Sequence, residues 1–291
     1  MRIEEALERF ETQLEADGRS VHTRKQYARH VRLFAAWARD LAPRGDRLEG
    51  LDHEAVAQFL ASPAATGREG GGQKLATSAN CLRSSLRMFL GYCHRAGYAP
   101  TDAGQLIRRA RCSPPPPRAM SEDDERRLLG VLAAGTGPEA ERDHALFHLL
   151  LRSGLRIGSA IALEREDVFL DRSELQIRRA KGDQRERVFL GKAITAHLKR
   201  YLAGRPGGPL LTDRSGRRIT QRHAQRRLAE WVARAGITSQ VSPHSLRHSF
   251  ATKLYRKTGD VLIVQAALRH RSIASTVVYA RPNEDRLRRA L

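Results

Sequence analysis

The residues of this chain whose types and spacing suit chemistry gather near its C-terminal end. His244 and Arg247 lie three positions apart, and His270 and Tyr279 follow them. Arginine binds phosphate through paired donors, histidine transfers protons near neutral pH, and a tyrosine hydroxyl can act as a nucleophile. In a chain of formal net charge +20, this set indicates attack of a phenolic oxygen on a phosphodiester of a nucleic acid.

The sequence around His244 predicts the start of a helix. Ser242 is a preferred N-cap residue, and Pro243 suits the first helical position. His244 then falls in the first turn, where free N–H groups and the helix dipole favour a phosphate, and Arg247 shares its face. The alternatives are a capped surface helix without a function, and a metal pair of His244 with His248. The metal pair lacks the glutamate of His-Glu-x-x-His and has a cation between its ligands, so no metal is expected.

Two segments further upstream can complete such a site. A helix is expected to end at Gly154, which presents Arg156 on the following loop. Lys181 lies in the turn of a predicted hairpin with strands at 175–178 and 186–190. The chain has 52 Lys and Arg residues, and its lysines are few. A lysine among other cations can release a proton that arginine keeps, so Lys181 can serve as a general acid. A lysine that simply suits an exposed turn is an equal alternative.

Tyr279 is the expected nucleophile among the six tyrosines of the chain. His270 follows an apolar helix predicted at 260–268, and Ser272 can cap a final helix that carries Tyr279. Tyr255 lies near the same motifs and is the alternative nucleophile. The tyrosines within amphipathic patterns are expected in the core or at an interface: Tyr27, Tyr92 and Tyr201. Several cations can stabilise a pentavalent phosphorane without a metal, so no cofactor is expected.

Composition places this chemistry in a folded, basic protein. The chain has 291 residues and 41% hydrophobic residues, enough for two domains with cores. Residues 1–112 hold 18 Lys+Arg and 13 Asp+Glu (net +5), and the remainder holds 34 and 19 (net +15). Nucleic acid is therefore favoured over a merely cationic surface, with most phosphate contacts in the C-terminal part. Cys81, Cys93 and Cys112 form no C-x-x-C pair, which argues against a disulfide framework or a zinc finger. Without a signal peptide or an apolar run of membrane-spanning length, the expected location is cytoplasmic and nucleoid-associated.

The expected fold class is mainly α with a small β-sheet. Apolar residues at helical spacing predict a compact helical DNA-binding domain over 1–112, with four helices and a loop over 65–72. Four prolines indicate a linker over 113–120, with the boundary near residue 115. Residues 121–291 are expected to form an α+β catalytic domain, with Ser121 capping its first helix and a second helix over 143–152. Basic residues that could contact DNA, or simply line solvated helix faces, are Arg24, Lys25, Arg29, Arg32, Arg83 and Arg87, with Arg178 and Arg179 in the hairpin.

In their order and spacing, Arg156, Lys181, His244, Arg247, His270 and Tyr279 resemble the tyrosine recombinases, also called the integrase family. The segment 153–156, Ser-Gly-Leu-Arg, is similar to the first arginine motif of that family. The segment 243–252, Pro-His-Ser-Leu-Arg-His-Ser-Phe-Ala-Thr, is similar to the second motif. The segment 268–272 leading to Tyr279 looks like the third. The N-terminal half resembles the core-binding domain of the family only in size and pattern.

The resemblance implies a covalent mechanism. Tyr279 would attack the scissile phosphate and give a 3′-phosphotyrosyl link with a free 5′-hydroxyl. Lys181 would protonate the leaving oxygen, and His244 would be the acid and base for the tyrosine. The 5′-hydroxyl of a partner strand would then reverse the reaction without ATP or metal.

The resemblance also implies how the phosphate and the partners are held. Arg156 and Arg247 would hold the non-bridging oxygens, and His270 would help to bind the phosphate. Two domains would clamp double-stranded DNA, and four protomers would assemble on two duplexes, with the tail at 281–291 docking on a neighbour. A second recombinase or an accessory protein is an open alternative as a further partner. The absence of room for an arm-binding domain favours the Xer-like group.

Two positions depart from the pattern of the family. Ser159 stands where a carboxylate commonly orients groups of the active site. Arg269 stands where a glycine usually precedes the third-motif histidine, and a left-handed backbone there would cost arginine about 1 kcal/mol more than glycine. Neither change touches a reacting group, so activity is expected to survive.

Two other classes of function compete with a recombinase. A type IB topoisomerase uses similar residues but relaxes DNA as a monomer. A non-catalytic accessory protein would bind DNA without a covalent adduct. The compact helical first domain and the protruding tail favour the recombinase.

Overall fold

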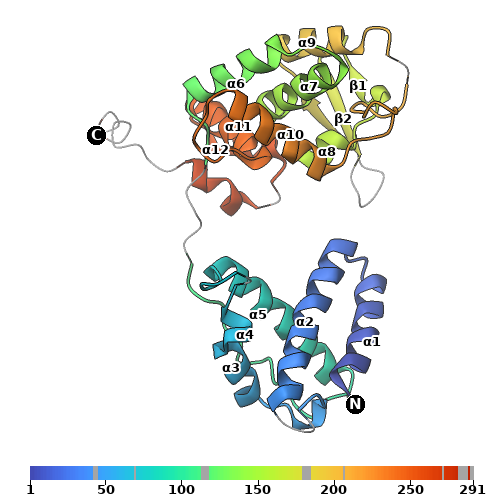
Figure 1. Cartoon of the computed structure of the whole chain (residues 1–291), viewed down its shortest axis with the longest axis vertical. Helices are drawn as coiled ribbons and strands as arrows, with labels where there is room; N and C mark the ends of the chain where they lie inside the picture. Colours follow the sequence, from blue (N-terminus) through green and yellow to red (C-terminus); the bar gives the residue numbers. More distant parts are fainter. Residues whose placement is uncertain are drawn as a thin grey trace. The chain divides into compact units, whose positions relative to one another are not determined.

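The computed structural model describes residues 1–41, 45–68, 70–112, 118–178, 185–205, 207–270, 272–280 and 288. The chain divides into two compact units, Met1–Pro114 and Pro115–Leu291, and each is described by itself. Figure 1 shows helices throughout both units and strands in the second. The predicted fold class, mainly α with a small sheet, is confirmed for the described residues.

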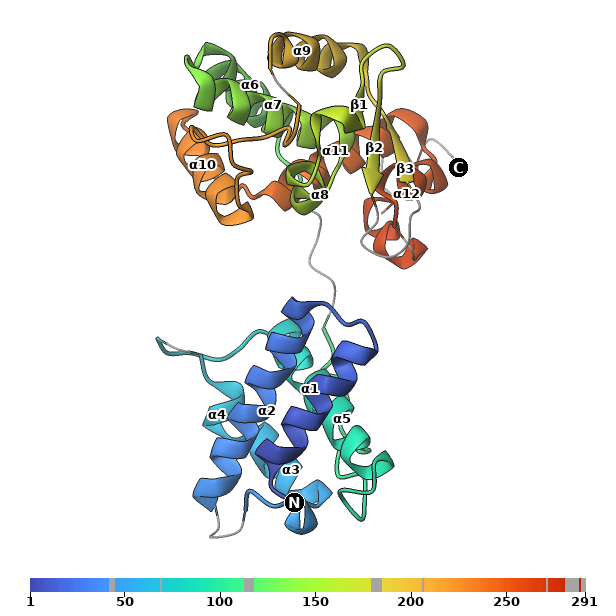
Figure 2. The same ribbon diagram turned by 90° about the vertical axis from the view of Figure 1, so that its right-hand side faces the viewer.

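The described elements of the first unit are α1 (Ile3–Ala16), α2 (Val21–Leu41), the 3₁₀ turn η1 (Leu48–Gly50), α3 (His53–Ala61), α4 (Pro63–Thr66) and α5 (Ala76–Arg95). In both views α2 lies beside α1 and α5 (Figures 1 and 2), and these helices pack together. Ser20 caps α2 by accepting from the Thr23 N–H at 3.2 Å, as its sequence predicts. The loop predicted over 65–72 is partly wrong. Its first two residues end α4, because Pro63 starts a helical turn there.

The core of the first unit is built from aromatic rings. The rings of Phe10 and Phe89 meet edge to face at 5.6 Å between centroids, and those of Phe34 and Phe59 at 5.1 Å. Edge-to-face pairs add stability beyond the area they bury. A buried polar pair crosses this core, with Nδ1 of His30 2.8 Å from Oγ of Ser85, and so connects α2 to α5.

The described elements of the second unit are α6 (Glu122–Ala134), α7 (Pro138–Ser153), α8 (Ile157–Ile161), η2 (Arg165–Asp167), β1 (Val168–Phe169), β2 (Glu174–Arg178), β3 (Arg185–Phe189), α9 (Lys192–Leu202), α10 (Gln221–Arg234), α11 (Pro243–Thr258), α12 (Val261–Leu268), η3 (Ile273–Ser275) and η4 (Val277–Tyr279). The three strands form an antiparallel sheet in the order β1-β2-β3. The predicted hairpin corresponds to β2 and β3, whereas β1 is too short to carry a periodic signal. None of the described helices has the length and apolar content needed to span a membrane.

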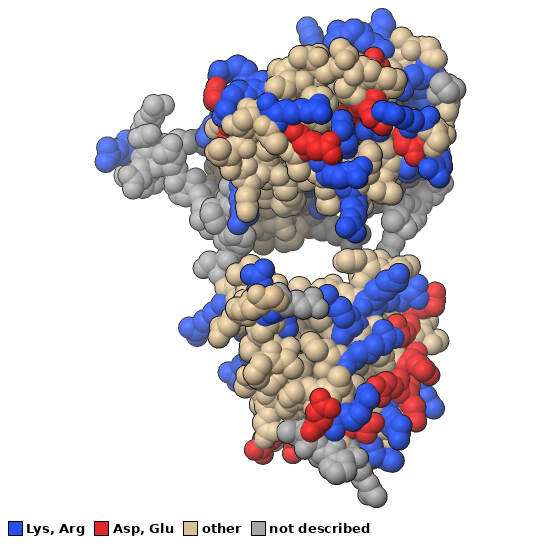
Figure 3. Space-filling model, viewed as in Figure 1, with Lys and Arg blue, Asp and Glu red and all other residues tan. Residues whose placement is uncertain are grey.

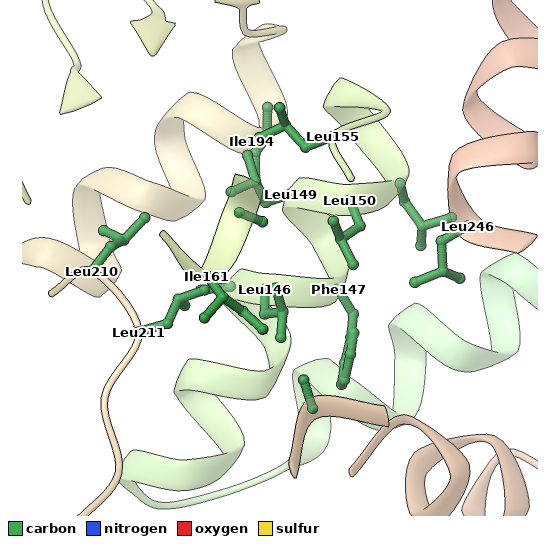
Figure 4. Close-up of a cluster of buried hydrophobic side chains, with 14 of the residues drawn as sticks. Leu146, Phe147, Leu149, Leu150, Leu155, Ile161, Ile194, Leu210, Leu211 and Leu246 are labelled. Atoms are coloured by element: carbon green, nitrogen blue, oxygen red, sulfur yellow. The ribbon is translucent and has the colours of Figure 1, made fainter. Parts of the chain in front are cut away.

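Helix α7 is the centre of the second unit. It packs against α6, α8, α9, α10 and α11, so its apolar residues face neighbours on several sides. Figure 4 shows the resulting cluster, which includes Leu146, Phe147, Leu149, Leu150, Leu155, Ile161, Ile194, Leu210, Leu211 and Leu246. The prediction that this helix starts at residue 143 was wrong. Pro138 occupies its first turn, so Asp143 lies inside the helix instead.

Asp143 organises a buried charge network. Both Arg142 and Asp143 are only 1% exposed. Oδ1 of Asp143 accepts from Arg142 at 2.6 Å, and Oδ2 accepts from Arg227 at 2.6 Å and from the Trp231 indole at 2.9 Å. A buried carboxylate is tolerated when hydrogen bonds satisfy it in this way. The network joins α7 to α10.

A second buried carboxylate connects α6 to α7 and α11. Glu125 is 3% exposed. Its oxygens lie 2.9 Å from Arg152 on α7 and 2.8 Å from Lys253 on α11. Ser121 caps α6 as predicted, by accepting from the Asp124 N–H. Glu125 therefore fixes α6 against both α7 and α11.

The last described segment differs from its prediction. A continuous final helix capped by Ser272 was expected. The structure has two 3₁₀ turns, η3 and η4, and Ser272 makes no side-chain cap. The β-branched Thr276, Val277 and Val278 disfavour an α-helix at this point.

Candidate active site

Helix α11 begins as its sequence predicts and carries a buried arginine. The Ser242 side chain accepts from the Ser245 N–H at 3.2 Å, and Pro243 occupies the first turn. Arg247 is 2% exposed. One Nη donates to the carbonyl of Gly154, and the other donates to the carbonyl of Leu268 at 2.7 Å. Carbonyls at helix ends lack partners within the helix, so one guanidinium here joins the ends of α7 and α12.

The turn at Gly154 leads into Arg156. Gly154 is left-handed with φ +61°, and a Cβ atom built there would lie 2.3 Å from the ring of Phe250. Helix α11 therefore packs directly against this backbone, which only glycine permits. Arg156 follows as the exposed N-cap residue of α8.

A pocket of about 600 Å³ lies against these two arginines. Its described lining is Leu155, Arg156, Ile157, Gly158, Ser159, Gln221, Gln225, Ser242, Pro243, His244 and Arg247. That lining contains arginines, amides and hydroxyls but no carboxylate, so it suits an anion. Ser159 therefore faces the pocket with Gln221 and Gln225 as its polar neighbours in the lining, in place of the acid that the family pattern expects.

Tyr279 meets a histidine inside an apolar cluster. It is 8% exposed and packs with Ala251, Val264 and Leu268. Its Oη lies 2.6 Å from Nδ1 of His248. Burial raises the pKa of Tyr279, and the charge of Arg247 partly opposes this effect.

His248 is the hydrogen-bond partner of the tyrosine hydroxyl. Burial, with the nearby His244 and Arg247, lowers the pKa of His248 to about 4. The ring is therefore neutral at pH 7. The family resemblance implies that His244 is the acid and base for the tyrosine, but the structure places His248 at the hydroxyl of Tyr279. The His244 ring stands edge to face on His248 at 4.4 Å and borders the pocket of the two arginines.

His248 could have been found from its spacing. It lies one helical turn after His244 on the same face of α11. The sequence interpretation weighed it only as a metal ligand.

His270 and Arg269 form the turn after α12. Nδ1 of His270 lies 2.8 Å from Oγ1 of Thr276. Burial lowers the pKa of His270 to about 4, and the charges of Arg247 and Arg156 add to this. Arg269 is left-handed with φ 53° and ψ 45°, so the extra cost of arginine over glycine in that conformation applies at this position.

The Arg269 side chain points to the sheet. Its Nε lies 3.7 Å from Oε2 of Glu186 on β3, and both groups are mostly buried. Burial, with the nearby Arg156, lowers the pKa of Arg269 to about 10. A third arginine thus stands beside Arg156 and Arg247, and a carboxylate from the hairpin approaches it. The sequence interpretation treated Arg269 only as a backbone departure.

The turn of the hairpin is the remaining part of the predicted site. Lys181 and Arg179 lie outside the described residues. Arg178 ends β2 opposite Arg185, and only its backbone is described.

The six residues of the first unit that were predicted to contact DNA lie in different surroundings. Arg29 lines a pocket of about 950 Å³ together with Arg32, Arg68 and Lys74. Arg24 is instead paired with Glu15 at 2.7 Å. Of the other three, Lys25 and Arg87 are exposed, and Arg83 is half-buried. Figure 3 shows basic and acidic side chains interspersed over the visible face of each unit.

Comparison with known protein families gives two matches. The family described as "Phage integrase family" matches residues 118–286. The family described as "Phage integrase, N-terminal SAM-like domain" matches residues 7–97.

Curated relatives cover nearly the whole chain. The tyrosine recombinase XerC of Neisseria meningitidis serogroup C is 33% identical over 282 residues, covering 94% of this chain and 89% of the relative. The tyrosine recombinase XerA of Thermococcus kodakarensis is 30% identical over 291 residues, covering 98% and 94%.

Solved structures share the fold at lower identity. XerH bound to its difH substrate in a pre-cleavage complex has a TM-score of 0.73 at 22% identity, covering 96% of this chain and 83% of that one. A lambda integrase fragment bound as a dimer to a core site has a TM-score of 0.72 at 18% identity, covering 94% and 97%.

Proposed function

Because the chain belongs to the phage integrase family, and is a site-specific DNA recombinase of the tyrosine class, we propose that Tyr279 forms the covalent link to DNA. The observation that carries this assignment is the 2.6 Å contact between Oη of Tyr279 and Nδ1 of His248. A phenol needs a base at its hydroxyl and positive charge near the phosphate. The second unit contains both, with His248 at the hydroxyl and the charges of Arg156 and Arg247 nearby.

Cleavage is a transesterification. Oη of Tyr279 attacks the scissile phosphorus, and its proton passes to neutral His248. The P–Oη bond forms while the bond to the 5′-oxygen breaks, and the leaving oxygen takes a proton from Lys181. The product is a 3′-phosphotyrosyl link with a free 5′-hydroxyl, and a 5′-hydroxyl of a partner strand reverses the same steps. The bond energy stays in the phosphotyrosine, so the reaction consumes no external energy source.

Arginines carry the charge of the transition state. Exposed Arg156 and buried Arg247 border one pocket, and we assign the non-bridging oxygens to them. Arg247 is held by two carbonyls before any DNA binds, so its position requires little reorganisation. Burial, with the charges of these arginines, lowers the pKa values of His244 and His270, and each ring can donate an N–H to an oxygen of the phosphate.

The partners are a double-stranded DNA target and further copies of the chain. Relatives have been solved with DNA as dimers and as a tetramer on a Holliday junction. The named Xer relatives favour action on chromosomal DNA, and so a nucleoid-associated location. The relatives are recombinases, which favours this function over a type IB topoisomerase or a non-catalytic accessory protein.

The test is a covalent adduct. Purified protein incubated with genomic DNA yields covalent attachment sites, and a nicked duplex that carries such a site then traps the adduct. Tyr279→Phe should bind this duplex normally and form no adduct, while the matched variant Tyr255→Phe should still form it. An adduct that persists in Tyr279→Phe, or is lost only in Tyr255→Phe, contradicts the assignment.

A further inference from the structure

A cluster of three histidines lies on α7 and α9, in the described part of the second unit, outside the site described above. His144 and His148 are one helical turn apart on α7, so their side chains share a face. His197 comes from α9, which packs against α7. One ring nitrogen from each of the three lies within 4.8 Å of the other two. Among the described residues, the ring contacts of these histidines are with one another and not with Arg156, Arg247 or Tyr279.

The three imidazole rings lie close enough together for one ion to contact all of them after side-chain rotation. The centroid of His197 is 4.1 Å from that of His144 and 5.3 Å from that of His148. The two rings of α7 are 5.6 Å apart. Tetrahedral zinc, with Zn–N bonds of about 2.0–2.1 Å, requires nitrogens about 3.3 Å apart. Small side-chain rotations close the difference, because each ring can turn about its own bonds.

Two nitrogens of the cluster lack a partner. Nδ1 of His148 and Nε2 of His197 are shielded from solvent and have no hydrogen-bond partner among the described residues. Buried polar atoms are normally satisfied, and an exception calls for an explanation such as a bound ion. A metal ion would accept lone pairs from both.

The charge around the cluster is compatible with a cation. Two arginines face the cluster, Arg152 and Arg200, and both disfavour a cation. The charge of Arg152 is countered by Glu125 at 2.9 Å, and Arg200 is exposed, where solvent screens it.

We propose that His144, His148 and His197 form a site for a divalent transition metal, typified by zinc, that joins α7 to α9. Three histidines with a water as the fourth ligand complete a tetrahedral shell. All three side chains are half-buried, so an ion can enter from solvent. The site would stiffen the helix that ends at Gly154, without taking part in strand cleavage.

The experiment is a zinc titration of full-length protein stripped with a chelator. Wild type should bind one zinc ion at this site, and saturation at about 100 times Kd should raise the melting temperature by about 5 °C or more. His197→Gln and His148→Gln should each weaken binding by at least about 100-fold, because loss of even an indirect partner of a metal ligand costs 10–100-fold. His197→Cys, which keeps a ligand, should retain binding.

Matched controls separate this site from others. His223→Gln, on α10 of the same unit, should bind zinc like wild type. Circular dichroism and melting without metal establish that each variant is folded. Equal binding by wild type and His197→Gln, or no binding by wild type at tens of micromolar zinc, overturns the proposal. Loss of the zinc in His248→Gln but not in His197→Gln would assign the ion to the active site and overturn it as well.

Discussion

The Oη atom of Tyr279 lies 2.6 Å from Nδ1 of His248, and this contact joins the last described turn of the chain to the helix that carries Arg247. The pKa of the tyrosine is raised by burial, and that of the histidine is lowered to about 4. A protonated phenol therefore faces a neutral base. In the proposed reaction, the histidine takes the proton of the tyrosine as the phenol attacks the phosphate.

His248→Gln should lower the rate of covalent adduct formation by about 10²–10⁴-fold, the usual contribution of a general base. Glutamine can still bond to the hydroxyl but does not take its proton. Binding of the uncleaved duplex should remain unchanged, as measured by gel shift. His223→Gln is the control. Wild-type cleavage by His248→Gln, together with a dead His244→Gln, would return the role of base to His244.

Gly154→Ala should destabilise the second unit by about 2–4 kcal/mol, through a left-handed alanine and overpacking against Phe250. The displaced carbonyl should also release Arg247, so the adduct should be lost. Denaturant unfolding and the adduct assay measure the two effects. Gly204→Ala is matched, because Gly204 is also left-handed but has open space around its Cβ position. The Gly204→Ala variant should lower the free energy of unfolding by about 1 kcal/mol and should still form the adduct. Equal effects of the two variants would show that the clash does not matter.

Arg269→Gly should raise the free energy of unfolding by about 1 kcal/mol, because glycine adopts the left-handed conformation without strain. Burial lowers the pKa of Arg269 to about 10, so the folded state also disfavours its charge. The same variant should weaken DNA binding and cleavage, since a cation beside Arg156 is lost. Glu186→Gln, which keeps the arginine, tests the ion pair alone. A less stable but fully active Arg269→Gly protein would contradict this account.

His30 should make the first unit sensitive to acid. Burial, with the charges of Arg29 and Lys74, lowers its pKa from 6.5 to about 4. Between these values the unfolded chain binds more protons than the folded one, so stability is complete above about pH 6.5 and falls as the pH drops towards 4. The expected loss is about 1 kcal/mol per pH unit from this residue.

Denaturant unfolding between pH 7 and pH 4.5 measures the effect. His30→Gln should flatten the dependence, whereas the control His53→Gln, which changes an exposed histidine of the same unit, should leave it intact. An unchanged slope in His30→Gln would assign the acid sensitivity to other groups.

The sequence alone determined the order of the candidate site residues and several of the local turns that present them. The start of α11 followed from Ser242 and Pro243, because capping is local and depends on adjacent residues. The glycine turn before Arg156 could be predicted for the same reason. Helical and strand periodicity also gave the fold class, since the burial of one face repeats along each element.

Only the tertiary structure decided which groups meet. His244 and His248 share one face of α11, and the packing of η4 against that helix selects His248 as the partner of Tyr279. Likewise, the sequence around Asp143 does not predict its hydrogen bond with the indole of Trp231, and the sequence around His148 does not predict its contact with His197. These contacts join residues far apart in the chain, and their distances depend on how helices cross. Side-chain pairing of that kind is set by packing, which local propensity does not specify.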